Sequence, residues 1–441
     1  ETEFIKSFGS ERKMRFFNLL LVILFISTVG WSFTPSDTIT SPEIWSGIVD
    51  ITGDVIIHAK VTIEPGTEIR FATTNDNIIN GDATHICLII RSGGALYAVG
   101  TESDSIRFTT AGPKVPDSWG EIDLEEGLDA ANTIFRYCVF EYGQNALDFR
   151  STNHEVVQVE GDIYIEHCHI HQMSRSGIYV TSGGCPKISY SRIHDMPSAG
   201  IFIHGGEIVD INYTYIYNVS VGIINAGMKN WFQKCNCDHI TIFNVDASRA
   251  TIVKWWTGYG IYCCNSTGRL KLKNSILANL DPQYPAVKLD TWYFITGYNC
   301  WWDYGYEAIE GGRDIASTSI EADPLFNNPA QYDLSLKSNS PCIGKAQDGS
   351  TIGAWQPGTG IQAPYVVSPA RQNKGFSQLG NGQLLFNLLT NSQTRTYSLL
   401  GQRLINKSFS PNRSYSGIYL LLLPESPEPA QNNCTTFVVI Q

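Results

Sequence analysis

The sequence predicts an all-β chain, a parallel β-solenoid followed by a smaller β domain. The first observation behind this fold class is an internal repeat. The same residue pattern occurs three times, about 23 residues apart, in "HIHQMSRSGIYVT" (169–181), "RIHDMPSAGIFIH" (192–204) and "YIYNVSVGIIN" (215–225). The second is the composition of the 441 residues, with 39 Gly, 12% aromatic and only 17% charged residues, which favours β structure.

The repeat is carried by apolar positions with fixed spacing. Ile165, Ile188 and Ile211 lie 23 residues apart, and a second isoleucine follows each of them after five residues. A period of about 20–50 residues indicates a repeat architecture. The apolar residues show no 3.6-residue period, so each unit is two or three short strands. Stacked units bury the apolar side that one unit leaves exposed, which predicts a continuous core.

One small polar position follows the second isoleucine of each unit. Asn and Asp tolerate unusual backbone angles and hydrogen-bond to neighbouring amides, so we interpret this column as a structural turn ladder. Its predicted members are Glu141, Gln172, Asp195, Asn218, Asn244 and Asn279.

Residues 1–33 contain a predicted export signal. Met14 opens "MRFFNLLLVILFISTVGWS", in which a basic residue precedes an apolar run and then small residues. This pattern is typical of a secretory signal peptide, and the apolar run is shorter than the roughly 20 residues of a membrane-spanning helix. We expect translation to start at Met14 and the first residues to lie upstream of it.

Residues 34–358 resemble right-handed parallel β-helix repeat proteins. The matching stretches at the start are "GDVIIHAKVTIEPGTEIRF" (53–71), "GGALYAVGTESDSIRFTT" (93–110) and "WGEIDL" (119–124). The stretch "ADPLFNNPAQYDLSLKSNSPCIGKAQDGSTIGAWQ" (322–356) is similar to the closing segment of that family. The resemblance implies a right-handed helix of ten to twelve coils.

The tail is a separate region. Residues 359–375 are rich in Pro, Gly and polar residues and are predicted to be a linker, and residues 376–441 show short alternating strands that predict a small β-sandwich. The pieces "YSLLGQRL" (397–404), "SGIYLLLL" (416–423) and "TTFVVIQ" (435–441) resemble the C-terminal sorting domain of type IX secretion cargo. This resemblance implies the type IX secretion machinery as a partner, and a secreted or outer-membrane-surface location in a Gram-negative bacterium.

The net charge of the chain narrows its possible binding partners. The formal net charge of -11 argues against nucleic acid, whose binders are usually basic, and we expect a monomer.

The cysteines are expected to be buried thiols. Eleven cysteines are an odd number, so at least one stays unpaired within the chain. The pairs in "CNC" (235–237) and at 263–264 lack metal-site spacing, so buried thiols are expected and no metal site is predicted.

The best candidate surface is one stripe of side chains. Side chains alternate on a strand, so the neighbours of the inward isoleucines are expected to face solvent. Stacked coils would place them in rows about 5 Å apart. The stripe comprises His169, His171, Arg192, His194, Tyr215 and Tyr217, with Thr241 and Phe243 next.

Two longer turns beside this stripe offer aromatic and basic side chains. Exposed Trp rings stack on sugars, and Lys or Arg would pair with uronate carboxylates, so inserted loops are expected to form a binding face. The predicted substrate-binding residues are Arg249, Lys254, Trp255, Trp256 and Trp231. Packing of these rings on one another is the structural alternative.

These features predict an exported protein that binds polysaccharide, and whether it is an enzyme stays open. The alternative is a polysaccharide lyase or glycoside hydrolase on the same face, with the stripe residues as acid, base or neutraliser. We expect no cofactor, except Ca²⁺ if the protein is a lyase. Asp195 is expected to point away from His194, and the carboxylates considered, Asp162, Asp195, Asp210 and Asp238, are scattered. The second alternative is a structural surface protein or adhesin without a small ligand.

Overall fold

The computed structural model describes most of residues 32–356 and three strands near the C-terminus. The described ranges are 32–75, 77–79, 84–150, 161–181, 184–205, 208–226, 234–250, 256–264, 269–290, 293–312 and 318–356, with the backbone of 395–398, 418–424 and 434–440. The chain divides into two compact units, Glu1–Pro364 and Tyr365–Gln441. The predicted signal peptide, Met14 included, and the linker 359–375 lie outside the described residues.

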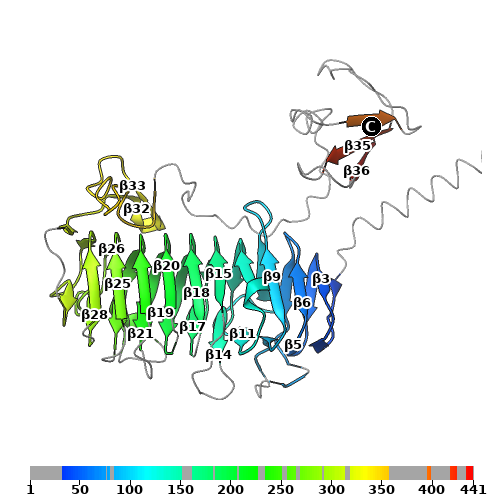
Figure 1. Cartoon of the computed structure of the whole chain (residues 1–441), viewed down its shortest axis with the longest axis horizontal. Coiled ribbons are helices and arrows are strands. Elements are labelled where there is room, and N and C mark those ends of the chain that lie inside the picture. The colour runs from blue at the N-terminus through cyan, green and yellow to red at the C-terminus, as the bar shows by residue number, and fades with distance from the viewer. Residues whose placement is uncertain are drawn as a thin grey trace, which may run out of the picture. The chain divides into compact units, whose positions relative to one another are not determined.

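The first unit is a parallel β-helix whose stacked coils contribute strands to three parallel sheets (Figure 1). Sheet 1 has ten parallel strands, which agrees with the ten to twelve coils expected. Its strands are β3 (Glu43–Trp45), β6 (Lys60–Ile63), β9 (Ala95–Val99), β12 (Ile134–Arg136), β15 (Asp162–Glu166), β18 (Cys185–Ser189), β20 (Ile208–Asn212), β22 (Lys234–Asp238), β25 (Arg269–Lys273) and β28 (Tyr293–Gly297).

Sheets 2 and 3 follow sheet 1 in each coil, and the long strands β19 and β21 run through both sheets. Sheet 2 comprises β1 (Ser32–Phe33), β4 (Ile48–Ile51), β7 (Glu68–Phe71), β10 (Ile106–Thr110), β13 (Cys138–Glu141), β16 (His169–His171), the first halves of β19 (Arg192–Ile203) and β21 (Tyr215–Asn225), β23 (Thr241–Val245), β26 (Ile276–Ala278), β29 (Cys300–Trp302) and β31 (Ile320–Glu321). Sheet 3 comprises β2 (Thr38–Ile39), β5 (Val55–Ile57), β8 (Leu88–Ile90), β11 (Ile122–Glu125), β14 (Leu147–Arg150), β17 (Ile178–Val180), the second halves of β19 and β21, β24 (Ile261–Cys263), β27 (Val287–Leu289) and β30 (Ile309–Glu310).

The core is the predicted ladder of inward apolar side chains. Ile165 pairs with Ile188 and Ile188 with Ile211, and all three are fully buried. In the preceding coil the ladder continues with phenylalanines, because Phe135 pairs with Ile165 and Phe140 with Ile170. Both phenylalanines are fully buried in the core.

In the coils from Tyr137 to Asp303, two corners are formed by single residues in the left-handed conformation. The corner between sheets 2 and 3 contains the predicted polar column, with one correction: Glu141 lies on β13 opposite His171, and Tyr142 takes the corner. Left-handed backbone is unusual for residues other than Gly, and Asn and Asp adopt it most readily. The corner residues and their φ angles are Tyr142 (70°), Gln172 (54°), Asp195 (57°), Asn218 (56°), Asn244 (53°), Asn279 (52°) and Asp303 (47°).

The corner between sheets 1 and 2 holds an aromatic ladder that the sequence reasoning did not identify. Its left-handed residues include Tyr137, His167, Tyr190, Tyr213 and His239. Each ring stacks on the next, with ring centroids 4.7, 5.1, 5.0 and 4.8 Å apart in chain order. Coil spacing in a parallel sheet, about 4.8 Å, is the distance at which such rings stack.

The closing segment, residues 322–356, folds back over the outer face of sheet 2. It contains the antiparallel hairpin β32 (Phe326–Asn328) and β33 (Asp333–Leu336), joined by the 3₁₀ turn η3 (Pro329–Gln331). The hairpin lies beside the end of the helix that carries β26 (Figure 1). Backbone contacts attach the segment, for example from the Gly353 N–H to the carbonyl oxygen of Asn274 at 2.7 Å.

The remaining described elements are short. The 3₁₀ turns η1 (Ala130–Asn132) and η2 (Ala247–Arg249) lie between strands of the first unit. In the second unit, β34 (Arg395–Ser398), β35 (Ile418–Pro424) and β36 (Cys434–Ile440) form an antiparallel sheet in the order β34-β35-β36. Among the described residues, no helix has the length and apolar character needed to cross a membrane.

Candidate functional site

The predicted stripe lies on the outer face of sheet 2, but most of it is buried under the closing segment. The expectation that its side chains face solvent is wrong for Tyr215 and Tyr217, which are 4% and 5% exposed. Leu334 and Leu336 of the closing hairpin belong to the same buried cluster as these tyrosines. Thr241 and Phe243 are buried as well, and His171 and His194 are nearly so. The stripe is therefore an internal layer of the protein for most of its length.

The three histidines of the stripe form one compact cluster. The Nε2 atoms of His169 and His194 lie 2.5 Å apart, so the N–H of one ring donates a hydrogen bond to the other ring. The ring of His171 is stacked on His194 at 5.3 Å, and its Nε2 lies 3.5 Å from Glu141 Oε2. Tyr217 stacks on the other side of His194 at 4.4 Å, and Tyr332 of the closing segment stacks on Tyr217 at 4.9 Å.

Asp195 contacts His194, against expectation. Its Oδ2 lies 2.9 Å from His194 Nδ1. The expectation assumed regular alternation along the strand, whereas Asp195 has a φ of 57°. The left-handed corner turns its side chain back to the side of the histidine. Burial alone would raise the pKa of Asp195, but hydrogen bonds from His194 and Asn218 lower it overall.

Burial favours the neutral forms of two of these histidines, His169 and His171. It is the main reason why the pKa of His171 falls to about 4 and that of His169 falls well below its ordinary value, and the neighbouring His194 adds to both shifts. Burial likewise raises the pKa values of Tyr215 and Tyr217. Arg192 is the remaining stripe residue; its guanidinium lies 5.5 Å above the ring of Tyr215. Buried neutral rings of this kind favour packing over proton transfer to a substrate.

The predicted substrate-binding loops are only partly described. Trp256 lies on the outer side of sheet 3, where its ring centroid is 5.6 Å from that of Phe202, so it does not join the stripe on sheet 2. Arg249 ends the 3₁₀ turn η2 and is half-buried. Lys254, Trp255 and Trp231 lie outside the described residues.

A groove of about 500 Å³ opens where the stripe ends; we call it the closing groove. One wall is the outer face of sheet 2 with the corner residues Asn244 and Asn279, and the other is the closing segment. Trp302, at the end of β29, is 42% exposed and lines this groove. The full lining is Phe243, Asn244, Ala278, Asn279, Trp302, Asp303, Asp323, Pro324, Leu325, Phe326, Pro329, Ala330, Tyr332 and Lys337.

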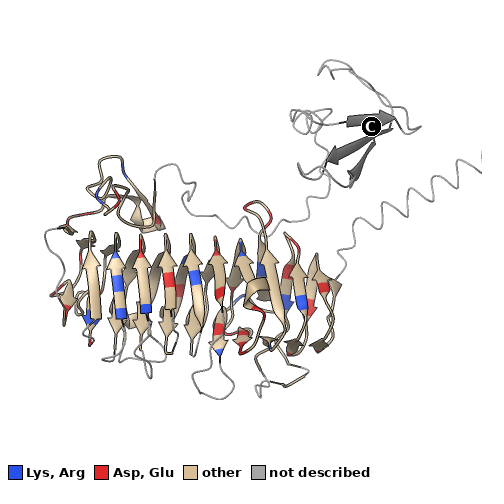
Figure 2. Cartoon of the chain, in the orientation of Figure 1, with Lys and Arg blue, Asp and Glu red and all other residues tan. Residues whose placement is uncertain are grey.

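Sheet 1 presents the opposite situation, a sheet with an accessible outer face. Charged side chains of both signs lie along its strands (Figure 2). Many of them pair with one another: Lys187 Nζ lies 2.5 Å from Asp210 Oδ2, and the guanidinium of Arg136 pairs with Glu166. Tyr164 on this face is 44% exposed. The face is accessible, but its charges largely satisfy each other.

A carboxylate cluster on the outer face of sheet 3 was missed by the sequence reasoning. Glu121, Asp123 and Glu125 come from the β11 region, and Asp148 and Arg150 from β14, where Asp123 pairs with Asp148. All four carboxylates are buried. The signal in the sequence is the alternation of acidic and apolar residues in "EIDLE" (121–125) and "LDFR" (147–150), which places acidic side chains on one face of adjacent strands.

Two aspartates of this carboxylate cluster have raised pKa values. Burial, followed by the charge of Glu121, raises the pKa of Asp148 to about 7 and that of Asp123 well above its ordinary value. Arg150 opposes these shifts; its Nη2 lies 2.5 Å from Glu121 Oε1 and 2.9 Å from Asp148 Oδ2.

The cysteines of "CNC" are buried thiols, as expected. Cys235 and Cys237 alternate inward on β22, and their Sγ atoms lie 3.7 Å apart in the core. Cys263 faces the core from β24. Cys235 and Cys237 occupy ladder positions that Val209 and Ile211 take in the preceding coil.

Comparison with known proteins supports the fold. Residues 127–280 match the family model of the right handed beta helix region. Comparison with curated proteins gives no match. The matched family and the long parallel sheets establish the first unit as a right-handed parallel β-helix.

Proposed function

We propose that this protein is an exported β-helix protein that binds a polysaccharide in the closing groove. The observation that carries the proposal is an exposed tryptophan, Trp302, on the wall of a groove of about 500 Å³. Ligand pockets of about 300–1,000 Å³ with aromatic walls and a few convergent polar groups are typical small-ligand sites. A tryptophan ring stacks on the apolar face of a sugar, and amide side chains such as Asn279 hydrogen-bond to hydroxyls.

The charge of the groove favours a neutral glycan over a uronate. Among its described lining residues, the carboxylates of Asp303 and Asp323 face only one ammonium group, that of Lys337. Like charges would repel an acidic sugar and raise the cost of its desolvation. The uronate preference suggested by Arg249 and Lys254 is therefore replaced by a preference for neutral hexose or pentose polymers.

The test is affinity electrophoresis of the purified full chain in gels containing neutral or uronate polysaccharides. We expect retention in at least one neutral gel, and Trp302→Ala should weaken it about tenfold or more, the range reported for loss of a central aromatic contact. Tyr164→Ala is the matched control, since it removes an aromatic side chain of similar exposure from sheet 1. Equal loss in both variants, or no retention of the parent, contradicts the groove as the site.

A glycoside hydrolase is the second candidate, since Asp303 and Asp323 line the same groove. Glycoside hydrolysis commonly uses two carboxyl groups on either side of the bond. Incubation of the full chain with the retained polysaccharide should then produce new reducing ends, lost in Asp323→Asn. A product with ultraviolet absorbance from an unsaturated sugar would instead indicate a lyase. Retention without either product supports a binding protein, and no retention on any gel supports a structural surface protein.

The proposal that the protein is exported rests on sequence patterns in the N-terminal and C-terminal regions. The pattern after Met14 is that of a secretory signal, and the strands β35 and β36 coincide with the stretches that resemble a type IX sorting domain. Expression of the full chain and of a chain ending at Gln356, in a Gram-negative host with type IX secretion, separates the two signals. We expect the full chain on the cell surface or in the medium and the shortened chain in the periplasm. Surface delivery of the shortened chain contradicts the role of the tail.

A further inference from the structure

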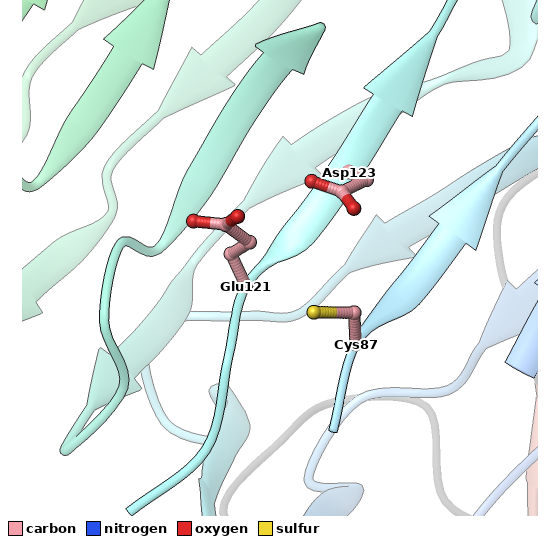
Figure 3. A group of neighbouring side chains, drawn as sticks. All are labelled: Cys87, Glu121 and Asp123. Carbon is pink, nitrogen blue, oxygen red and sulfur yellow. The ribbon is translucent and has the colours of Figure 1, made fainter. Parts of the chain in front are cut away.

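The outer face of sheet 3 gathers three ligand-type side chains (Figure 3). Cys87 directly precedes β8 and Glu121 directly precedes β11; the next residues, Leu88 and Ile122, pair with each other, so the thiol and the carboxylate lie on adjacent coils. Asp123 lies two residues after Glu121, on the same face of the strand. One ligand atom from each residue lies within 4.8 Å of the others, and all three residues are buried.

Local backbone is adapted to this close approach. Gly120 precedes Glu121, and a Cβ added to it would lie 2.4 Å from Cys87 Sγ, which no side chain tolerates. The Gly120 N–H donates to the carbonyl oxygen of Ile86 at 2.9 Å, which fixes the two coils against each other. The glycine therefore leaves the space that the sulfur atom occupies.

Two carboxylate oxygens at this place lack a donor. No described residue offers a hydrogen bond to Asp123 Oδ1 or to Asp148 Oδ1, although both atoms are buried. Asp123 is only 1% exposed. A buried acceptor without a partner is unfavourable, and more so when it is charged, so such atoms indicate a bound partner such as a cation.

The charges of the cluster do not balance. Glu125 is paired with Arg91 at 2.8 Å. The other three carboxylates, of Glu121, Asp123 and Asp148, share the single guanidinium of Arg150. Ionisation of all three would leave two negative charges without compensation in a buried place, where an unpaired charge is strongly unfavourable. One divalent cation would offset these charges and would give the carboxylate of Asp123 a partner.

We propose that Cys87, Glu121 and Asp123 bind a divalent transition-metal cation, with Zn²⁺ as the best match. A thiolate together with carboxylates suits Zn²⁺, whereas Mg²⁺ and Ca²⁺ take oxygen ligands. Binding replaces the proton of the Cys87 thiol by the metal, so one proton leaves to solvent for each thiolate formed. The inference does not rest on glycan binding, because the closing groove lies on sheet 2.

The experiment uses the purified full chain, stripped with a chelator and then loaded with ZnCl₂ or CoCl₂. We expect one tightly held zinc per chain after gel filtration and a rise in the thermal midpoint, since a ligand of the native state stabilises it. Cobalt should give the near-ultraviolet charge-transfer band of a thiolate ligand. Both signals should be lost in Cys87→Ser, and the zinc in Asp123→Asn.

Controls separate ligand loss from misfolding. Cys264→Ser and Asp162→Asn change a half-buried cysteine and an exposed carboxylate elsewhere on the helix and should bind zinc as the parent does. Metal-free Asp123→Asn should be at least as stable as the metal-free parent, because it removes an uncompensated buried charge. Absence of stoichiometric zinc in the parent, a cobalt complex without the thiolate band, or zinc retained by both site variants overturns the proposal. If the variants do not fold, the parent's cobalt spectrum alone decides.

Discussion

The outer faces of sheets 1 and 2 follow the same strand pattern but have opposite environments. On both sheets, apolar side chains point into the helix and their neighbours point outward. On sheet 1 the outward Tyr164 is 44% exposed, whereas on sheet 2 the outward Tyr217 is 5% exposed. The difference comes from the closing segment, which packs on sheet 2 through Leu334 and Leu336. Strand alternation thus sets the direction of a side chain, and a distant segment sets its exposure.

The same comparison explains where a ligand can bind. The stripe of sheet 2 is buried where the closing segment packs on it. On the same sheet Trp302 is exposed and lines the closing groove. The cover also supplies part of the groove wall, including Tyr332. A flat face such as that of sheet 1 offers no second wall. The covering segment is therefore both an obstacle over the tyrosines of the stripe and a part of the candidate site.

The largest expected effect is on stability, from truncating the two outward tyrosines. Tyr217→Ala should lower the free energy of unfolding by about 3–5 kcal/mol, because it leaves a cavity between His194 and Tyr332. Tyr164→Ala should change it by only about 0.5 kcal/mol, as surface substitutions do. Urea unfolding followed by circular dichroism measures both. Similar costs for the two variants would show that the closing segment does not cover sheet 2 in solution.

The next largest effect is a dependence of stability on pH, caused by the buried His171 on sheet 2. In the unfolded chain His171 takes up a proton near pH 6.5, but in the folded protein only near its pKa of about 4. Between these values the unfolded state binds more protons, so the free energy of unfolding falls as the pH is lowered from 6.5 to 4, by about 3 kcal/mol for this residue.

Urea midpoints measured across this pH range test the burial of the histidine cluster. His171→Gln should flatten the dependence, since glutamine does not titrate. A parent protein whose stability stays constant from pH 6.5 to 4 would show that the histidines are solvated, and the contrast between the two faces would then disappear.

The smallest effect compares two asparagines in adjacent coils. Asn218 has a φ of 56°, donates to Asp195 and accepts from Asn244 Nδ2 at 3.0 Å. Asn218→Ala should cost about 1–3 kcal/mol from backbone strain and lost hydrogen bonds. Asn236 on sheet 1 donates to Asp210 Oδ1 at 2.7 Å, and Asn236→Ala should cost about 0.5–1.5 kcal/mol.

Thermal unfolding of the two asparagine variants separates the role of the corner from that of a hydrogen bond. Asn218→Gly is the informative third variant, since glycine adopts the left-handed conformation without strain and should recover part of the loss. A cost for Asn218→Gly equal to that of the alanine variant would assign the whole effect to hydrogen bonding.

The repeat and its core could be predicted from the sequence, and the site could not. The 23-residue spacing of Ile165, Ile188 and Ile211 reappears as direct strand pairing because coil length fixes which residues stack. The contact between His194 and Asp195 was predicted wrongly, since alternation ignores the left-handed corner at Asp195. The pairing of Asp123 with Asp148 went unnoticed because that coil is not 23 residues long, so the repeat does not align them.

The sequence by itself determined the all-β solenoid, the inward ladder and most of the polar corner between sheets 2 and 3. These depend on local periodicity and on the short-range pairing of each coil with its neighbour. Only the tertiary structure decided which outward face stays exposed, because Leu334 lies more than 100 residues from Tyr217 and no local pattern links them. The closing groove and the cation-ligand cluster have the same origin: side chains that are distant in sequence become neighbours when the coils stack and the closing segment folds back.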